Sequence, residues 1–286
     1  MGEARFVVPF GAEGAADRAA RAFAGALSFP QTLNDIIIEN LPGAGGCAGV
    51  RRANELARSS VATLLLGTPT THVLLAARLG EGDAPDKSFH PLLGLGSAPN
   101  VLLASPTLGV QTLAELIDKA RRTRLIYASA GTGQTIHLCT ALLCRQAGLA
   151  MTHRPYDGGS ATAYADLVRG DVHVYFDSLL GCRERIARGD AIALAVSAAQ
   201  RSALLPLVPT LIESGFPEHS LEVWLGVFGA NLPDETVDAI ARLAGDTALA
   251  GQLRSLGLRD GPLAAAGLVS QMDESTEAWR KALAAA

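Results

Sequence analysis

The residues best suited to bind a ligand lie near the start of the chain, in RFVVPFGAEGAADRAARAFAGAL. An apolar run from Phe6 to Phe10 ends in a glycine-containing loop, and a helix-like pattern follows. Backbone N–H groups at the start of a helix lack partners within the helix, and the helix dipole adds about half a positive charge there. The segment therefore predicts a cradle for an anion such as a carboxylate, formed by Phe10, Gly11, Ala12, Glu13 and Gly14.

Two later segments repeat this order of strand, loop and helix, at Leu64 to Thr71 and at Ile126 to Thr135. The first offers the hydroxyl of Thr68 directly after its strand. In the second, SAGTGQ, glycine permits the positive φ and the close backbone approach that a carboxylate-binding turn needs. Its candidates are Ser129, Gly131, Thr132, Gly133 and Gln134. The alternative for this segment is a tight connection between strand and helix that binds nothing.

The remaining candidates each have a structural alternative. Asp17, in the first helical turn, either caps its helix or supports a ligand indirectly. His137 is either a packed histidine or a ligand contact. Tyr156, in PYDGG with Gly158, offers a flat face and a hydroxyl, and a buried core tyrosine is the alternative. Asp177 ends a strand, where it could hold a ligand amino group, cap a helix or order a bridging water.

Signatures of catalysis and of cofactor binding are missing from the sequence. It has no G-x-x-x-x-G-K-[ST] phosphate loop and no G-x-S-x-G nucleophile motif. GAGGCAG contains G-x-G-x-x-A, but Leu41 and Pro42 separate it from the preceding strand. The six histidines and four cysteines show no metal-binding spacing. We expect no catalytic residue, metal or cofactor, and we expect buried thiols, with a disulfide between distant cysteines as the alternative in an oxidising compartment.

Composition limits the class of protein. The 286 residues are 49% hydrophobic and 18% charged, which is enough for the core of one large domain or two ordinary ones. A net charge of −4, with no basic block longer than an arginine pair, argues against nucleic-acid binding. No window reaches the roughly 18 apolar residues of a membrane span. A strand so close to Met1 is typical of a mature chain whose leader has been removed, although a cytosolic chain would look the same.

Buried strands alternate with amphipathic helices along the chain. The strands are expected at 6–10, 35–39, 63–66, 101–104, 125–128, 173–176, 191–196 and 221–230. T-L-A-E predicts a capping box between Thr112 and Glu115, and Pro233 opens a later helix. The Ala-rich C-terminus predicts a surface helix that frays. This alternation indicates an α/β fold whose sheets are mostly parallel and carry helices on both faces.

Seven motifs in order resemble one family. The opening VPFGAEGAADRAAR resembles V-P-F-x-A-G-G-x-x-D-x-x-A-R, the start of the periplasmic solute receptors of tripartite tricarboxylate transporters, often called the Bug family. IIIENLPGAGG, LLLGT, PNVLLASP, YASAGTGQTIHL, RPYDGGSATAYADLVRGDVHVYFD and LAVSAAQRSALLPLVPTLIESGFP resemble the family's later motifs. The similarity covers nearly the whole chain.

The resemblance implies a type II periplasmic-binding-protein fold with two lobes. Residues 1–99 with 221–286 would form the first lobe, and residues 100–220 the second. Crossing strands near Val101 and Val223 would form the hinge, and the ligand would lie between the lobes at the carboxyl ends of the strands.

The implied function is that of a monomeric periplasmic receptor. It would capture a small carboxylate or amino acid by lobe closure and deliver it to a membrane permease. One alternative is a ligand-sensing module that docks on a sensor kinase, and another is a small-molecule enzyme on a similar scaffold. The ligand itself cannot be transferred from a relative.

Glu13 is the most informative departure from the family pattern, because it occupies a position where glycine is usual. An acid there would repel a bound carboxylate unless its side chain faces solvent. If it faces the ligand, an amine or another hydrogen-bond donor on the ligand is expected instead.

Overall fold

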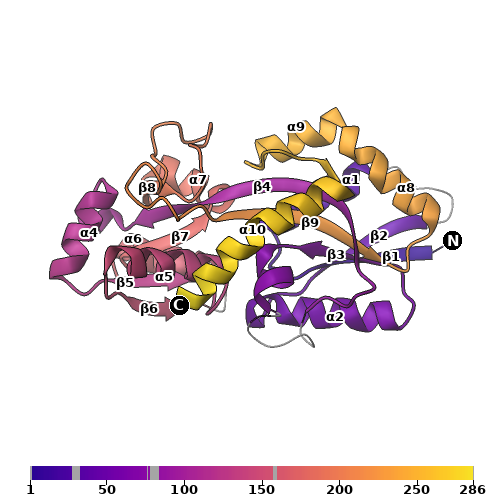
Figure 1. The fold of residues 1–286 in the computed structure, drawn as a ribbon, viewed down its shortest axis with the longest axis horizontal. Helices are drawn as coiled ribbons and strands as arrows, with labels where there is room; N and C mark the ends of the chain where they lie inside the picture. Colours follow the sequence, from indigo (N-terminus) through magenta and orange to yellow (C-terminus); the bar gives the residue numbers. More distant parts are fainter. Residues whose placement is uncertain (1, 28–32, 76, 78–83, 157–159, 286) are drawn as a thin grey trace. The chain divides into compact units, whose positions relative to one another are not determined.

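The fold is a mixed α/β arrangement, seen in a computed structural model that describes residues 2–27, 33–75, 77, 84–156 and 160–285 (Figure 1). The strands are β1 (Gly2–Val8), β2 (Leu33–Asn40), β3 (Thr63–Gly67), β4 (His90–Ala104), β5 (Ile126–Ser129), β6 (Thr152–Pro155), β7 (Val174–Ser178), β8 (Ile192–Val196), β9 (Glu222–Ala230) and β10 (Leu263–Ala264). The helices are α1 (Ala15–Ala26), α2 (Cys47–Arg58), α4 (Leu113–Arg122), α5 (Thr135–Ala147), α6 (Ser160–Arg169), α7 (Leu179–Arg188), α8 (Asp234–Arg242), α9 (Thr247–Ser255) and α10 (Ala265–Ala285). Short helical turns are η1 (Ala44–Gly46), η2 (Thr70–Leu74), η4 (Pro106–Leu108) and η5 (Leu243–Gly245).

The chain divides into two compact units. Unit 1 comprises residues 1–97 and 224–276, and unit 2 comprises residues 98–223 and 277–286. Strands β4 and β9 each contain residues of both units. The functional lobes expected from the sequence, with boundaries near residues 99 and 221, stay a prediction.

Unit 1 is organised around β1, which is parallel to β2 on one side and to β3 on the other. Two helices of 12 residues, α1 and α2, connect these strands, as parallel pairing requires. Phe6 and Phe23 join β1 to α1 through rings whose centroids are 5.6 Å apart. Because β1, β2 and β3 are parallel, the loops that follow them emerge at the same edge of the sheet.

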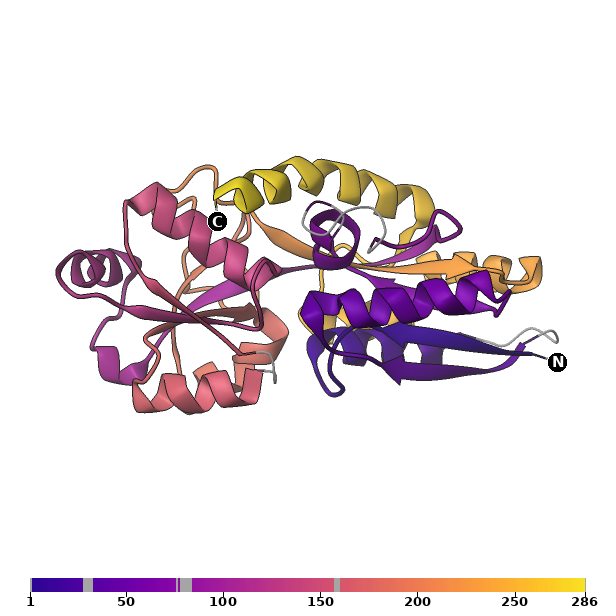
Figure 2. The ribbon, with the colours of Figure 1, turned by 90° about the horizontal axis from the view of Figure 1, so that it is seen from below.

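Unit 2 repeats this arrangement around β5, which is parallel to β6 and to β7. Figure 2 shows α5 on one side of these strands and α6 and α7 on the other. The alternation of strand residues therefore assigns Tyr127 and His153 to the face toward α5, and Tyr175 and Asp177 to the face toward α6 and α7.

Two expectations about secondary structure are corrected. The described sheets are mixed rather than mostly parallel, because β9 is antiparallel to β3, and β4 is antiparallel to β7, β8 and β10. The C-terminal helix packs instead of fraying. Trp279 and Ala282 are fully buried, and the Trp279 indole N–H donates to the carbonyl of Glu222 at 3.2 Å.

The capping box predicted at α4 is confirmed. The Thr112 hydroxyl accepts from the Glu115 N–H at 3.2 Å, and the Glu115 carboxylate accepts from the Thr112 N–H at 3.3 Å. In contrast, β6 was missed, because its sequence THRP is polar and half-exposed and so lacks the apolar pattern of the other strands.

Candidate functional site

Three loops meet at the carboxyl edge of the unit 1 sheet, after β1, β2 and β3. Gly49 packs so closely on the residue after β1 that a Cβ there would lie 2.6 Å from the Pro9 Cα. Gly46, at φ 91°, lies where a Cβ would be 3.2 Å from Thr71 and 3.7 Å from Pro9. Only glycine allows this close approach. The glycines of GAGGCAG are therefore explained by the packing of the three loops, without a role in dinucleotide binding.

The loop from Phe10 to Gly14, called here the first loop, is mostly exposed at this edge. Gly11, Ala12, Glu13 and Gly14 are exposed, and Phe10 is half-buried. Glu13 has φ 63°, which places it in the left-handed region that glycine favours. Gly14 is the N-cap residue of α1 and has no side chain, so no N-cap side chain covers the backbone N–H groups of the first turn.

Asp17 fastens the first loop. Its buried carboxylate accepts hydrogen bonds from the Glu13 backbone N–H at 2.8 Å, from Arg21 at 3.0 Å and from Asn40 at 3.0 Å. Burial raises the pKa of Asp17, but the hydrogen bonds from Arg21, Glu13 and Asn40, with the charge of Arg21, outweigh it and hold the pKa below the ordinary value. These contacts connect the first loop to α1 and β2, and the indirect support of a ligand by Asp17 stays a prediction.

Asn40 is a site residue that the sequence reasoning did not select. Its side-chain amide donates to Asp17 of α1 and also to the Phe10 carbonyl at 3.3 Å, so it connects the end of β2 to the start of the first loop and to the helix that follows the loop. The signal for it was present, because Asn40 is the asparagine of the motif IIIENLPGAGG.

Thr68 is buried in a turn that it closes with Thr71. The Thr68 N–H donates to the Thr71 hydroxyl at 3.0 Å, and the Thr71 N–H donates to the Thr68 hydroxyl at 3.4 Å. The Thr71 hydroxyl also lies 2.9 Å from Nδ1 of His72, whose ring stacks on Phe228 at 4.0 Å. Burial lowers the pKa of His72 to about 3, so this ring is neutral at physiological pH.

The loop from Ser129 to Gln134, called here the second loop, connects β5 to α5 in unit 2. Gly131 and Gly133 have φ values of 136° and 74°, the conformation for which glycine was expected here. The fully buried Ser129 hydroxyl accepts from the Gly131 N–H at 3.2 Å and lies 2.6 Å from Nε2 of His153. Thr132 is exposed at the tip of the loop.

Two imidazole rings support the second loop. Nδ1 of His137 accepts a hydrogen bond from the Gly133 N–H at 3.2 Å, and its ring lies 4.3 Å from the ring of His153. His153 stacks in turn on Tyr127 at 4.8 Å. The Gln134 side chain closes the loop by donating to the Ala130 carbonyl at 2.7 Å. His137 thus packs beneath the loop. His153 was not predicted as a site residue, because it lies in β6, a strand that the sequence pattern does not indicate.

Tyr156 and Asp177 have internal partners. The Tyr156 hydroxyl donates to Asp166 at 2.5 Å, and its ring packs on the unit 2 core. Asp177 accepts from the Tyr164 hydroxyl and from the Ser178 N–H, each at 2.7 Å. Burial raises the pKa of Asp177 to about 6, although these hydrogen bonds act in the opposite direction. Gly158 lies outside the described residues.

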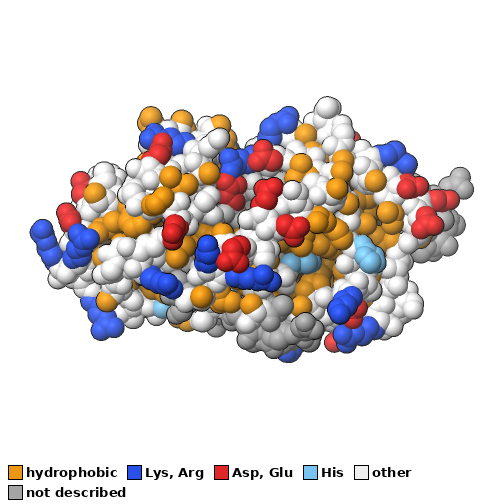
Figure 3. All heavy atoms as spheres, in the orientation of Figure 1, with side chains coloured by type: hydrophobic (Ala, Val, Ile, Leu, Met, Phe, Trp, Pro, Cys, Tyr) orange, Lys and Arg blue, Asp and Glu red, His pale blue; other side chains and the backbone are white. Residues whose placement is uncertain are grey.

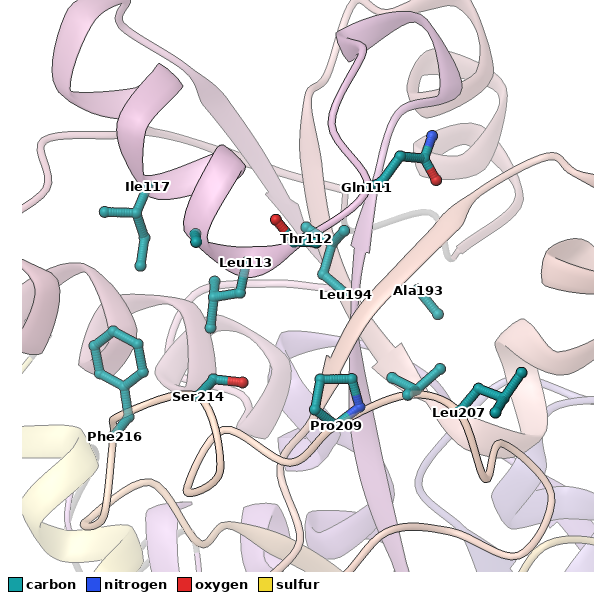
Figure 4. Close-up of a pocket in the computed structure, with 12 residues that line it drawn as sticks. Gln111, Thr112, Leu113, Ile117, Ala193, Leu194, Leu207, Pro209, Ser214 and Phe216 are labelled. Carbon is teal, nitrogen blue, oxygen red and sulfur yellow. The ribbon is translucent and has the colours of Figure 1, made fainter.

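A pocket of about 550 Å³ lies elsewhere in unit 2, between α4, β8 and the segment 207–216 (Figure 4). Its lining is mainly apolar and includes Leu113, Ile117, Pro209 and Phe216, with Leu207 89% exposed at its rim. None of the predicted site residues lines this pocket, so it is separate from the two loops.

Charged side chains of both signs are interspersed over the face in Figure 3. Within the described ranges, no group of three His, Cys, Asp or Glu side chains is arranged to hold a metal ion. None of the four cysteines, all of them described, forms a disulfide. Among the helices that the structure describes, none has the length and apolar character needed to cross a membrane.

Comparison with known proteins identifies relatives over most of the chain. Residues 20–253 match the family model of the tripartite tricarboxylate transporter family receptor. A protein of Pseudomonas sp. strain P51, described as a UPF0065 protein in the tcbD-tcbE intergenic region, is 31% identical over 289 residues, which cover 96% of this chain and 84% of that protein. BugT of Bordetella pertussis is 30% identical over 243 residues, 82% of this chain and 72% of its own.

Solved structures agree with this result. R. palustris Rpa4515 with adipate has a TM-score of 0.86 at 28% identity and covers 100% of this chain and 97% of its own. MatC of Rhodopseudomonas palustris with bound malate has a TM-score of 0.82 at 26% identity, with coverages of 99% and 98%. The periplasmic binding protein BugD has a TM-score of 0.82 at 24% identity, with coverages of 98% and 97%. The periplasmic-binding-protein fold expected from the sequence is confirmed.

Proposed function

Because the chain belongs to the tripartite tricarboxylate transporter receptor family, we propose that it captures a small dicarboxylate in the periplasm and delivers it to a membrane permease. The first and second loops are its contact points for the ligand. The relatives Rpa4515 and MatC hold adipate and malate, which are both dicarboxylates, and this supports the same ligand class here.

The observation that carries this proposal is the matching construction of the two loops. Each follows a central parallel strand and leads into a helix. The N-cap residues of these helices, Gly14 and Gln134, make no side-chain hydrogen bond to the first turn. Among the other helices, α4, α7 and α9 are capped by Thr112, Ser178 and Asp246, whereas α2 and α8 also lack a side-chain cap. Uncapped N-termini leave backbone N–H groups available to a carboxylate, and the helix dipole favours its charge.

The exposed side chain of Glu13 bears on the ligand class. An exposed carboxylate is hydrated and screened by salt, so its repulsion of a bound anion is weakened. This allows a plain dicarboxylate as ligand, whereas an amino acid would be favoured if Glu13 contacted the ligand directly. A comparison of succinate with aspartate, which have the same carbon skeleton, separates these two cases.

The test is a calorimetric and thermal-shift screen with adipate, malate, succinate and aspartate, using the dimethyl ester of each binding acid as the control. At a concentration of 100 Kd, a ligand should stabilise the folded state by about 2.7 kcal/mol, and its ester should not. Each acid should be recovered unchanged, since the role is capture and not turnover. A panel without binding, confirmed by calorimetry, would contradict solute capture.

A further inference from the structure

The Ser129 hydroxyl lies at the start of the second loop and has three polar neighbours. It is fully buried, and the Gly131 N–H donates to it at 3.2 Å. The Gly131 carbonyl oxygen also lies 3.2 Å from it, and Nε2 of His153 lies 2.6 Å away. The hydroxyl therefore closes the first turn of the loop, in which Gly131 has φ 136°, and His153 reaches this hydroxyl from β6.

The single proton of the Ser129 hydroxyl determines what the His153 ring must do. A hydroxyl donates one hydrogen bond and accepts two. A backbone N–H can only donate and a carbonyl can only accept, so the two contacts with Gly131 use one lone pair and the proton. Nε2 of His153 must then donate to the second lone pair. In the other tautomer, the hydroxyl would donate to Nε2, and its oxygen would face the Gly131 carbonyl oxygen at 3.2 Å with no proton between them.

Packing holds the His153 ring in the orientation that this bond needs. The ring is half-buried and stacks on Tyr127 of β5, with centroids 4.8 Å apart and planes at 18°. Tyr127 is also the residue that lies opposite His153 in the parallel pairing of β5 and β6. Burial lowers the pKa of His153, so the ring is neutral at pH 7.5 and carries one proton.

The backbone after β6 holds the same point of the second loop. The Tyr156 N–H donates to the Ser129 carbonyl at 2.9 Å. The segment from His153 to Tyr156 therefore contacts Ser129 through both its side chain and its backbone. The backbone bond fixes where the loop leaves β5, and the bond from His153 fixes the direction of the hydroxyl that closes the turn.

We propose that His153 is a positioning residue for ligand capture. Its Nε2–H donates to the Ser129 hydroxyl and turns that hydroxyl toward the Gly131 carbonyl, which holds the second loop ready for a carboxylate. This inference rests on the proposed function. The gain in affinity comes from preorganisation, because a loop that already has its bound conformation loses less freedom when the ligand binds. His153 acts through Ser129 and needs no contact with the ligand.

The direct test is the tautomer of the His153 ring in the wild-type protein at pH 7.5. Proton–nitrogen correlation NMR distinguishes a ring protonated on Nε2 from one protonated on Nδ1, and the spectrum of His153→Phe assigns the signals. The proton should be on Nε2. A proton on Nδ1 would overturn the proposal, because His153 would then accept from Ser129 instead of donating to it. Hydrogen exchange should show a Gly131 amide that is protected in the wild type and in His153→Gln but not in His153→Phe.

The second readout is affinity for adipate and malate at pH 7.5. His153→Phe keeps an aromatic ring against Tyr127 but has no N–H, and its affinity should fall by about tenfold, the loss of roughly one hydrogen bond. His153→Gln should recover most of this loss, because its side-chain N–H can donate from the place of Nε2. A Gln variant that binds no better than the Phe variant would refute the proposal.

His173→Phe is the matched control. His173 is also half-buried and also bonds β5, but at the start of the strand, where its Nδ1 accepts from the Ile126 N–H at 3.0 Å. This variant should lose stability and keep wild-type affinity. Equal losses of affinity in the two Phe variants would assign the effect to general destabilisation and would contradict the proposal.

A double variant decides whether His153 acts through Ser129. Ser129→Ala removes the hydroxyl, and affinity should fall by about the same factor as in His153→Phe. The protein with both changes should bind no more weakly than either single variant. Losses that multiply would show that the two residues act independently, and the proposal would fail. If neither acid binds the wild type, the proposed function fails, and the ring tautomer and the Gly131 amide still decide whether His153 holds the loop.

Discussion

The first loop of unit 1 and the second loop of unit 2 end in similar backbone conformations but are stabilised by different chemistry. The first is exposed and is fastened by an ionised carboxylate, with Arg21 and Asn40 as its partners. The second is largely buried and is fastened by neutral groups, the Ser129 hydroxyl and the rings of His137 and His153.

This difference shows that one local geometry can be secured in two ways with different costs. A buried carboxylate carries a desolvation penalty that only several charge-assisted hydrogen bonds can offset. A neutral ring avoids this penalty, but it can accept a hydrogen bond only while it stays unprotonated. We therefore expect substitutions and acid to affect the two loops unequally.

The largest effect is expected from Asp17→Asn. Asn has an NH₂ group in place of one carboxylate oxygen. The side chain can therefore no longer accept all three hydrogen bonds, from the Glu13 N–H, Arg21 and Asn40. The free energy of unfolding should fall by about 3 kcal/mol, and ligand affinity should fall with it. Chemical denaturation measures the first and calorimetry the second.

The control is Asp118→Asn on the exposed face of α4, where the carboxylate forms an ion pair with Arg121 at 3.8 Å. This change should cost less than about 0.5 kcal/mol. An Asp17→Asn protein as stable as this control would show that Asp17 does not fasten the loop.

The pH dependence sharpens the same comparison. The pKa of Asp17 is lower in the folded chain than in the unfolded chain, so its stabilisation is complete above the unfolded value of 3.8 and is lost as pH falls through the folded value. The difference in stability between wild type and Asp17→Asn should stay constant from pH 8 to pH 5 and shrink below about pH 4. A difference that already shrinks near pH 6 would assign the effect to another group.

A smaller effect is expected from Gly133→Ala in the second loop. A residue with a Cβ at φ 74° is strained, and the loss of stability should be about 1 kcal/mol. Gly148→Ala is the matched control, because φ is 64° there and no atom lies within 4 Å of an added Cβ. Both variants should lose similar stability, but only Gly133→Ala should lose affinity for the ligand. Equal affinities would separate the second loop from binding.

The smallest effect, with the opposite sign, is expected from Glu13→Gly in the first loop. Glycine relieves the strain at φ 63°, and the N–H that Asp17 accepts is retained. Stability should rise by at most about 1 kcal/mol, since part of the gain is lost to the greater freedom of glycine in the unfolded chain. A fall in the denaturation midpoint would instead indicate that the Glu13 side chain contributes to stability.

Much of the candidate site follows from local sequence. The loops at Phe10 and Ser129 come directly after apolar runs and before amphipathic helices, which is enough to place them at strand ends. The family pattern has glycine at position 13. The backbone there is in the left-handed region that glycine favours, which explains this preference. The partners of these loops were harder to find, because Asn40 and His153 come from other strands, and His153 lies in one without an apolar pattern.

The sequence by itself determined the family, the α/β class and the positions of the two loops, because ordered motifs and apolar periodicity are local properties of the chain. Only the tertiary structure decided how each loop is held. It paired Asp17 with Asn40 and brought His137 onto His153, contacts that span 23 and 16 residues of sequence. Hydrogen bonds between distant segments depend on strand order and side-chain direction, and these are fixed only when the sheets form.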